Sequence, residues 1–342
     1  MKLLFPTKPA EGEGPKRHKR TQWRFGPSPS AGFVSLLVLF LCTACAAATS
    51  QAVGSPVERP DPRLQRELAA AVQGFHGSVG LYVHHLGTGA TAAIAADDTF
   101  PTASMVKVPI MVGVFDAISR GRFAFTDTAP EPRARAKYPE DDISAGLSDT
   151  ARITVSRLVT LSLTYSDNSA SLWLQQLAGG GAAINGWLEG QGFAVTRVNA
   201  RTDGREADYD RWGWGQTTPR EMARLVSLIR QGRVVSPAAS EEMYRTMTRS
   251  FWTGEALSRL PPTVQAASKQ GAVDRSRSEV VLVNAPSGDY VFCVITKNQQ
   301  DESWKPDNEG YLLLRRVSAA LWKYFEPHHP WSPAPGAETF KP

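Results

Sequence analysis

The chain has 342 residues, of which 42% are hydrophobic and 21% are charged, so it has the composition of an ordinary globular protein with a sizeable core. Its formal net charge is +5, but residues 1–48 alone hold seven Lys and Arg against two Glu and account for all of it. The rest of the chain is neutral overall, which excludes the basic footprint that a nucleic-acid partner requires.

The first 48 residues have the order of an export signal. A basic segment precedes an apolar stretch at 33–41, and small residues follow at 43–48. We expect residues 1–48 to be a cleaved signal peptide, or a lipoprotein leader attached to the membrane through Cys45. An uncleaved anchor is the alternative, because apolar or small residues at 31–48 approach the length of a membrane span. Each of these interpretations predicts an exported protein, periplasmic or extracellular.

The N-terminal part of the body has the pattern of a helix followed by a β-hairpin. Residues 49–60 are polar and contain proline, which predicts a linker. Asp61 and Pro62 then provide the N-cap and first-turn proline of a helix that we expect to end near residue 72. Two strand patterns follow, joined by a Gly-Thr-Gly turn, at 78–85 and 90–95.

Helical patterns dominate the middle of the chain. Apolar residues recur at helical spacing, or cap residues mark a helix start, at 104–119, 154–164, 169–177, 182–188, 218–230 and 236–247. Two long stretches, 122–150 and 199–216, lack this periodicity and are expected to be loops. The second is long enough to suggest a functional role.

The last third of the chain changes to strands and ends in a helix. Strand patterns occur at 264–269, 279–284 and 289–297, and an amphipathic helix is expected at 308–325. A Pro-rich tail at 327–342 is expected to be disordered. Cys293 is the one cysteine after Cys42 and Cys45, so the body has no internal disulfide and depends on its core for stability.

This order of elements predicts an α+β fold in one catalytic domain at 61–326. A five-stranded antiparallel sheet made from both ends of the chain would be flanked by the terminal helices. A helical lobe, at about 122–250, would be inserted between the two groups of strands.

Ser104 and Lys107 lie three residues apart at the start of a predicted helix, so their side chains share one face. A hydroxyl beside an amine that can become neutral forms a nucleophile with its base. A free Lys has a pKa near ~10.4, so Lys107 needs burial or a nearby cation to lose its proton at neutral pH.

Two further short motifs follow Ser104-x-x-Lys107 along the chain, about sixty and then about a hundred residues apart. Ser166-Asp167-Asn168 falls in the turn between two predicted helices, and Lys269-Gln270-Gly271 ends a strand pattern. Together with Ser104-x-x-Lys107, they resemble the motifs of the penicillin-recognising serine hydrolases, the class A β-lactamases and D-Ala-D-Ala peptidases. The resemblance covers about residues 60–326. It implies a β-lactamase/transpeptidase-like fold that works without a metal or another cofactor.

The resemblance also implies a role for each motif residue. Ser104 would be acylated, Lys107 would take its proton, and Ser166 would relay a proton to the leaving nitrogen. The N–H of Ala272 would form an oxyanion hole with that of Ser104. The other substrate-binding residues implied by the resemblance are Asn168, Lys269, Gln270 and Gly271.

One departure from the family pattern concerns the substrate carboxylate. The family usually has a Thr or Ser where this chain has Gln270, so an amide replaces the hydroxyl that contacts the carboxylate. Arg275 or Arg277 is a candidate charge partner for it. For each of these two arginines, an exposed strand residue without a role in binding is an equally good interpretation.

A second departure concerns the release of the acyl group. Class A enzymes carry a Glu that activates the deacylating water, and the corresponding position here lies near Thr202, which cannot act as a base. Four nearby acidic residues are out of register with that position, namely Asp203, Glu206, Asp208 and Asp210. The sequence therefore predicts acylation of Ser104 and does not identify the deacylating group.

The leading functional hypothesis is an exported, monomeric serine hydrolase of the class A β-lactamase type that hydrolyses a β-lactam amide. The alternatives are a D-Ala-D-Ala peptidase, another amide or ester hydrolase of this fold, or a penicillin-binding receptor that stays acylated. A glutaminase of the same fold is a weaker rival because of the export signal. The expected partner is a small β-lactam or cell-wall peptide, and no nucleic acid is expected.

Overall fold

The computed structural model describes residues 57–130, 142–147 and 151–340. The predicted leader, most of the predicted linker and part of the 122–150 stretch lie outside these residues. Within the described part of the chain, no helix is both long enough and apolar enough to cross a bilayer.

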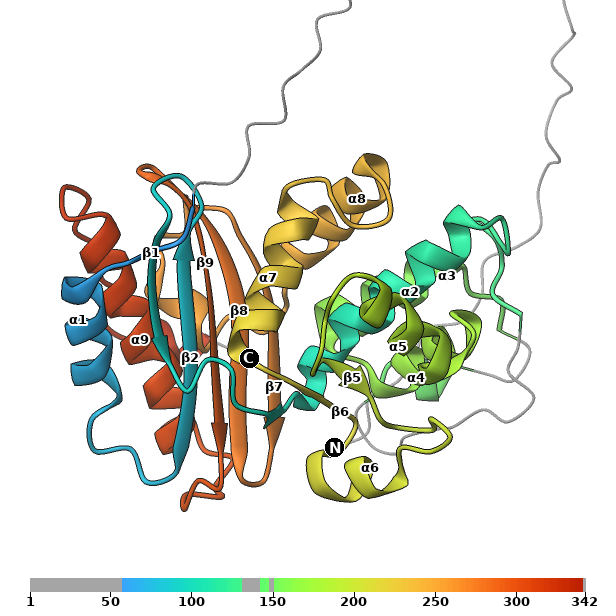
Figure 1. Ribbon diagram of the computed structural model, residues 1–342, viewed down its shortest axis with the longest axis horizontal. Helices are drawn as coiled ribbons and strands as arrows, with labels where there is room; N and C mark the ends of the chain where they lie inside the picture. The colour runs from blue at the N-terminus through green and yellow to red at the C-terminus, as the bar shows by residue number, and fades with distance from the viewer. Residues whose placement is uncertain (1–56, 131–141, 148–150, 341–342) are drawn as a thin grey trace, which may run out of the picture. The chain divides into compact units, whose positions relative to one another are not determined.

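The main sheet is built from both ends of the described chain, as predicted (Figure 1). Its order is β1-β3-β2-β9-β8-β7, and all neighbours are antiparallel except β1 and β3. The five predicted strands are thus joined by a sixth, the two-residue β1 in the segment expected to be a linker. The bounds are β1 Arg59–Pro60, β2 Ser78–His85, β3 Ala90–Ile94, β7 Ala266–Val273, β8 Ser276–Ala285 and β9 Gly288–Lys297.

The helices follow the predicted order, with an additional one in the 199–216 stretch. Their bounds are α1 Pro62–Val72, α2 Lys107–Ser119, α3 Val155–Thr160, α4 Asn168–Leu177, α5 Gly180–Gly190, α6 Glu206–Trp212, α7 Pro219–Arg230, α8 Pro237–Met247 and α9 Glu309–Phe325. Short 3₁₀ turns form η1 Ala103–Val106, η2 Ser144–Gly146, η4 Ala256–Arg259 and η5 Ala337–Phe340, and η3 Leu161–Tyr165 is a π-helical turn. A small second sheet joins β4 Phe100–Pro101, β6 Gly215–Thr217 and β5 Arg197–Val198.

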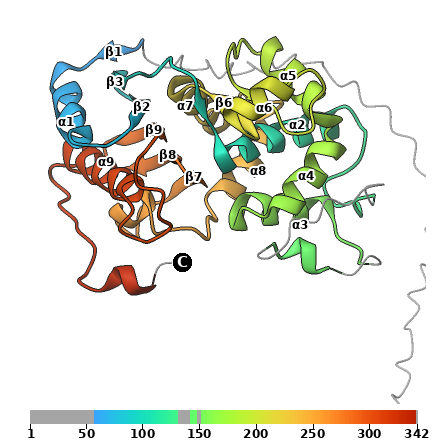
Figure 2. The same cartoon turned by 90° about the horizontal axis from the view of Figure 1, so that it is seen from below.

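The main sheet is buried on both faces. Helices α1 and α9 cover one face, where Val281 of β8 belongs to the same apolar core as Leu68 of α1 and Val317 of α9. On the other face, Val280 and Leu282 join a core that includes residues of α2 and α7 (Figure 2). Because successive strand residues point to opposite faces, a strand segment covered on both sides has a continuous apolar sequence, as residues 280–283 of β8 and 290–295 of β9 do.

The 199–216 stretch departs from the expectation of a loop, because it contains α6 and β6. No residue of α6 is buried, so the segment lacks the apolar periodicity that predicts a helix. Local charges stabilise it instead. Arg205 forms an ion pair with Asp208 at 3.0 Å. The negative Glu206 lies in the first turn and the positive Arg211 in the last turn, where the helix dipole stabilises each charge.

Two other segments differ from the sequence-based expectation. The Lys-Gln-Gly motif lies inside β7, which continues to Val273, and does not end the strand. In the tail, Trp331 packs against the core under α9, and Trp322 Nε1 donates a hydrogen bond to the carbonyl of His329 at 2.9 Å. The expectation of disorder is therefore wrong for this part of the tail.

Candidate active site

Ser104 lies in the 3₁₀ turn η1, directly before α2 begins at Lys107. Side chains at positions i and i+3 of a 3₁₀ turn eclipse each other more closely than in an α-helix. Lys107 Nζ accordingly lies 3.0 Å from Ser104 Oγ. The predicted contact of hydroxyl and amine is therefore present, although the helix type around Ser104 differs from the expectation.

The amine of Lys107 is fully buried and surrounded by oxygen atoms. Its Nζ lies 3.0 Å from Ser104 Oγ, 3.0 Å from Ser166 Oγ, 2.5 Å from the Ser166 carbonyl and 2.7 Å from Asn168 Oδ1. An amine has at most three N–H groups, so it cannot donate a separate hydrogen bond to each of these four oxygens. When Lys107 is neutral, its lone pair is free to accept the proton of a serine hydroxyl.

Burial lowers the pKa of Lys107 to about 7, against the attraction of the Asp142 and Asp167 carboxylates, which raise it. The ring of Trp214 lies over the amine, 6.0 Å from Nζ to the ring centroid. A pKa of about 7 means that a large fraction of Lys107 is neutral at physiological pH. This is the state that a general base for Ser104 requires.

Ser166 joins Lys107 to a second buried amine. It follows the π-helical turn η3 and has a left-handed backbone, with φ of 63°. A left-handed backbone is uncommon for a residue other than glycine and carries some strain. In this conformation, Ser166 Oγ accepts hydrogen bonds from Lys107 Nζ and from Lys269 Nζ, each at 3.0 Å. A proton can therefore pass between Lys107 and Ser166 without movement of the backbone.

Two carboxylates hold the turn that carries Ser166 and Asn168. Asp167 is the N-cap of α4 and accepts hydrogen bonds from the amides of Ala170 and Ser144. Asp142 accepts hydrogen bonds from the amide of Asn168 at 2.9 Å and from the amide of Ser169. Both contacts satisfy free N–H groups at the start of a helix. They fix the direction in which Asn168 meets Lys107.

Lys269 lies on β7 and is also fully buried. Burial, and then the charge of Lys107, hold the pKa of Lys269 well below its ordinary value, while Glu279 and Glu255 oppose the shift. The Gln270 side chain turns toward the same amine, because Lys269 Nζ donates to Gln270 Oε1 at 2.8 Å. Gln270 thus contacts Lys269 and is not among the described residues that line the cavity at Ser104.

Gly271 lets β7 pass directly against the turn that carries Ser104. A Cβ added at this position would lie 2.6 Å from the Thr102 carbonyl and 2.9 Å from the Ser104 amide nitrogen. Any side chain at Gly271 would therefore displace the nucleophile or the strand. The next residue, Ala272, lines the same cavity as Ser104, which is consistent with the predicted pair of oxyanion-binding N–H groups.

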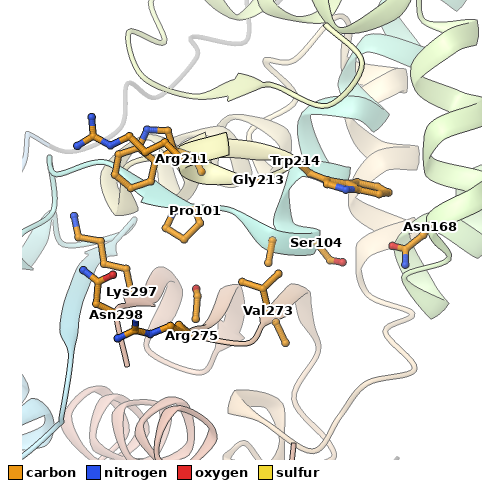
Figure 3. A pocket seen from close by; sticks show the side chains of 14 residues that line it. Pro101, Ser104, Asn168, Arg211, Gly213, Trp214, Val273, Arg275, Lys297 and Asn298 are labelled. Atoms are coloured by element: carbon orange, nitrogen blue, oxygen red, sulfur yellow. The ribbon is translucent and has the colours of Figure 1, made fainter. Parts of the chain in front are cut away.

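A cavity of about 680 Å³ opens at Ser104, with Asn168 and Trp214 beside it (Figure 3). None of the described residues that line it carries a carboxylate. The structure also holds no cluster of three or more His, Cys, Asp or Glu suited to a metal ion within its described part.

The residues considered for deacylation do not line this cavity. Thr202 is buried against Gly181 of α5 and donates a hydrogen bond to the Ala200 carbonyl at 3.1 Å. The four acidic candidates also lie outside the described lining of the cavity. Asp208 forms an ion pair with Arg205, and the other three are exposed, namely Asp203, Glu206 and Asp210.

The two arginines considered as partners of the substrate carboxylate differ in position. Arg275 lines the cavity. Arg277 is buried and stacks on the rings of Trp304 and Tyr311.

Two carboxyl groups, those of the buried Glu279 and the partly buried Glu255, lie near Lys269 and favour its charged form. Glu279 of β8 is fully buried and accepts hydrogen bonds from Ser268 Oγ at 2.6 Å and from the Ala256 amide at 2.8 Å. Burial, and then repulsion from Glu255, raise the pKa of Glu279 to about 8. Glu279 is therefore largely protonated in the folded protein at neutral pH.

The wild-type protein is expected to become less stable as pH rises, because Glu279 ionises. Replacing Glu279 by Gln should prevent this decrease in the free energy of unfolding. The folded pKa of about 8 lies above the ordinary value of 4.5, so ionisation disfavours the folded state between these pH values. From pH 5 to pH 8, the wild type should lose stability relative to Glu279→Gln, by an amount on the order of 1 kcal/mol or more. Urea unfolding at both pH values measures the difference, with the exposed Glu241→Gln as control. The same pH dependence in wild type and Glu279→Gln would contradict the expectation.

The two-sheet fold with its helical lobe, and the network from Ser104 through Lys107 and Ser166 to Lys269, are features of the penicillin-recognising serine hydrolase family. The sequence profile of the β-lactamase enzyme family matches residues 63–325. Because this match spans most of the chain, the chain belongs to that family.

Individual relatives are distant but cover most of the chain. The β-lactamase of Streptomyces albus G is 26% identical over 260 residues, which are 71% of this chain and 80% of that protein. The solved structure of PBP-A superposes with a TM-score of 0.70 at 27% identity, covering 80% of this chain and 99% of PBP-A. A PBP-A mutant, solved as an acyl-enzyme complex with penicillin G, superposes with a TM-score of 0.69 at 26% identity over the same shares of the two chains.

Proposed function

We propose that the chain is a serine hydrolase that opens the amide of a β-lactam through an acyl-enzyme on Ser104, and that the hydrolysis of this acyl-enzyme is slow. The observation that supports the proposal most strongly is the hydrogen-bonded chain from Ser104 Oγ through Lys107 Nζ and Ser166 Oγ to Lys269 Nζ. It combines a nucleophile, a base of suitable pKa and a path for the proton.

The acylation step follows from this arrangement. Neutral Lys107 takes the proton of Ser104 Oγ as that oxygen bonds to the carbonyl carbon of the substrate. The negative charge on the carbonyl oxygen is stabilised by N–H groups at Ser104 and Ala272. When the C–N bond breaks, Ser166 gives its proton to the leaving nitrogen and receives one from Lys107, which becomes neutral again.

The second step requires a water molecule and a base to activate it. Thr202 cannot serve as that base, and no carboxylate is present among the described residues that line the cavity. Lys107 is neutral again after acylation and is the remaining candidate. Because no carboxylate lies among the described residues that line the cavity, we expect the acyl-enzyme to persist much longer than a typical catalytic turnover.

A D-Ala-D-Ala peptidase is the second candidate function. The same chain of groups can cleave the terminal amide of a D-alanyl-D-alanine peptide, because the nucleophile, base and proton relay have the same tasks. The lack of a carboxylate among the described residues that line the cavity favours this candidate, because a persistent adduct with a β-lactam is expected of a peptidase rather than of a β-lactamase. A peptide acyl group and a β-lactam acyl group would occupy the same Ser104.

The two candidates are separated by measuring turnover of both substrate types on one preparation. A chromogenic cephalosporin reports β-lactam opening, and release of D-alanine from an N-acylated D-Ala-D-Ala peptide reports peptidase activity. We expect one rapid equivalent of cephalosporin opening, followed by slow turnover. Rapid D-alanine release would favour the peptidase. If neither substrate reacts and no covalent adduct forms, the proposed function is wrong.

A further inference from the structure

The cavity at Ser104 extends to an end lined by three cations. Arg211 comes from the end of α6, Arg275 from the turn between β7 and β8, and Lys297 from the end of β9. Figure 3 shows Arg211 and Lys297 on the side of the cavity away from Asn168, with Arg275 at its lower edge. We call these three residues, together with Ser276, the cationic end.

Lys297 has no carboxylate partner among the described residues. Its Nζ donates one hydrogen bond, to the Thr99 carbonyl at 2.9 Å, and lies 4.2 Å from the centroid of the Phe100 ring and 5.6 Å from that of Trp212. An ammonium group carries three N–H donors, so two remain for a ligand. The aromatic rings also keep this amine at the wall of the cavity and limit its hydration.

Arg275 and Arg211 keep part of their guanidinium groups available. The contacts of Arg275 with described residues both use Nε, with the Gln299 carbonyl at 3.3 Å and with Glu302 at 3.5 Å. Its two terminal nitrogens can therefore still bind a carboxylate in a bidentate manner. Arg211 stacks on Trp212, with 4.7 Å from Cζ to the ring centroid.

Ser276 lies in the wall of the cavity beside Arg275. Its side chain is 2% exposed and lines the cavity next to Arg275, yet its Oγ has no hydrogen-bond partner among the described residues. A buried hydroxyl without a partner is costly in a folded protein. The Oγ itself is closed to a water-sized molecule, so a ligand reaches it only after the side chain moves, and the three cations define the site.

The chemistry of acylation determines which part of the substrate reaches the cationic end. Ser166 delivers the proton to the leaving nitrogen, so the leaving group lies on the side of Ser166 and Lys269. The acyl group must then extend from the carbonyl carbon in the other direction, past Val273. Arg211, Arg275 and Lys297 line this part of the cavity.

We propose that the cationic end binds an anionic group, a carboxylate, on the acyl side of the substrate, and that the protein prefers substrates with such a group. This inference rests on the proposed function, because it deepens the specificity of the same site. The three cations come from separate segments and line one cavity that has no acidic residue in its described lining.

The test uses three penicillins that share one ring system and differ in the acyl substituent: benzyl, α-carboxybenzyl and α-aminobenzyl. The second-order rate of acylation is measured by intact mass for each compound, at low and high salt. We expect the carboxylated compound to react about tenfold faster than the benzyl compound at low salt, with a smaller advantage at high salt. The double variant Lys297→Gln/Arg275→Gln should lose this advantage, so that the ratio of the carboxylated to the benzyl rate falls to about one. Arg245→Gln, an exposed change on α8, is the matched control.

A charge-reversed variant makes the outcome sharper. Lys297→Glu should shift the preference from the α-carboxybenzyl to the α-aminobenzyl compound. Equal rates for the carboxylated and benzyl compounds in the wild type, or an unchanged preference in the double variant, would overturn the inference while the proposed function stands. If none of the three compounds acylates the wild type, the proposed function itself fails.

Discussion

Replacing Ser104 by alanine is expected to abolish the covalent adduct with a penicillin, lowering the rate of acylation by at least about 10⁴-fold. In the proposed mechanism the Ser104 hydroxyl is the nucleophile. Ser166 Oγ also lies 3.0 Å from Lys107 Nζ, but of the two serines only Ser104 is among the described residues that line the cavity. Intact mass after incubation with excess penicillin measures the result. Ser119→Ala, at the exposed end of α2, should behave as the wild type. An adduct that survives in Ser104→Ala and maps to Ser166 would mean that the nucleophile is misassigned.

Replacing Lys107 by methionine is expected to slow acylation by about 10²–10⁴-fold, the usual contribution of a general base. Methionine fills much of the same buried space without an amine. In the wild type, the neutral fraction of Lys107 grows as pH rises through its pKa of about 7, so acylation should rise with pH and level off above this value. Lys107→Met should be slow and lack this rise.

The pH profile distinguishes a catalytic role from a merely structural one. Acylation rates of the wild type and of Lys107→Met are compared across the pH range, with the exposed Lys323→Met as control. A rise with the same midpoint in Lys107→Met would show that another group is the base. Lys269 would then be the first candidate, because it shares Ser166 with Lys107.

The fold was predictable where the sequence carries local or periodic signals. Asp61 caps α1 and Thr218 caps α7, as their positions before a proline indicate. The strands of the main sheet were also found, except for the two-residue β1, because β-branched and apolar residues run between turn residues. Helix α6 was missed, since none of its residues is buried and a helix without a buried face leaves no periodic pattern.

The candidate site was predictable where it rests on motifs. Ser104, Lys107, Ser166 and Lys269 were proposed from spacing and resemblance, and the structure joins them by hydrogen bonds. Asp142 was missed, because its carboxylate holds Asn168 from 26 positions away in the chain, and no local pattern marks such a contact. The nearer cap, Asp167, had a usable signal, since it directly precedes the predicted helix.

Two further features depend on tertiary packing alone. The Gln270 amide turns to Lys269, a side-chain direction that its position on a strand does not reveal. The cationic end is assembled from residues of α6, the β7–β8 turn and β9, which are far apart in the sequence. Only the fold shows that these cations line one cavity with Ser104.

The most direct test of the central claim is a time course of intact mass after a short reaction with penicillin and removal of the excess. One adduct per chain is expected, located on the peptide that contains Ser104. It should persist for many minutes, because no carboxylate among the described cavity residues activates water. A return to the unmodified mass within seconds, together with sustained turnover, would contradict slow deacylation. The absence of any adduct and of any turnover would contradict the acyl-enzyme itself.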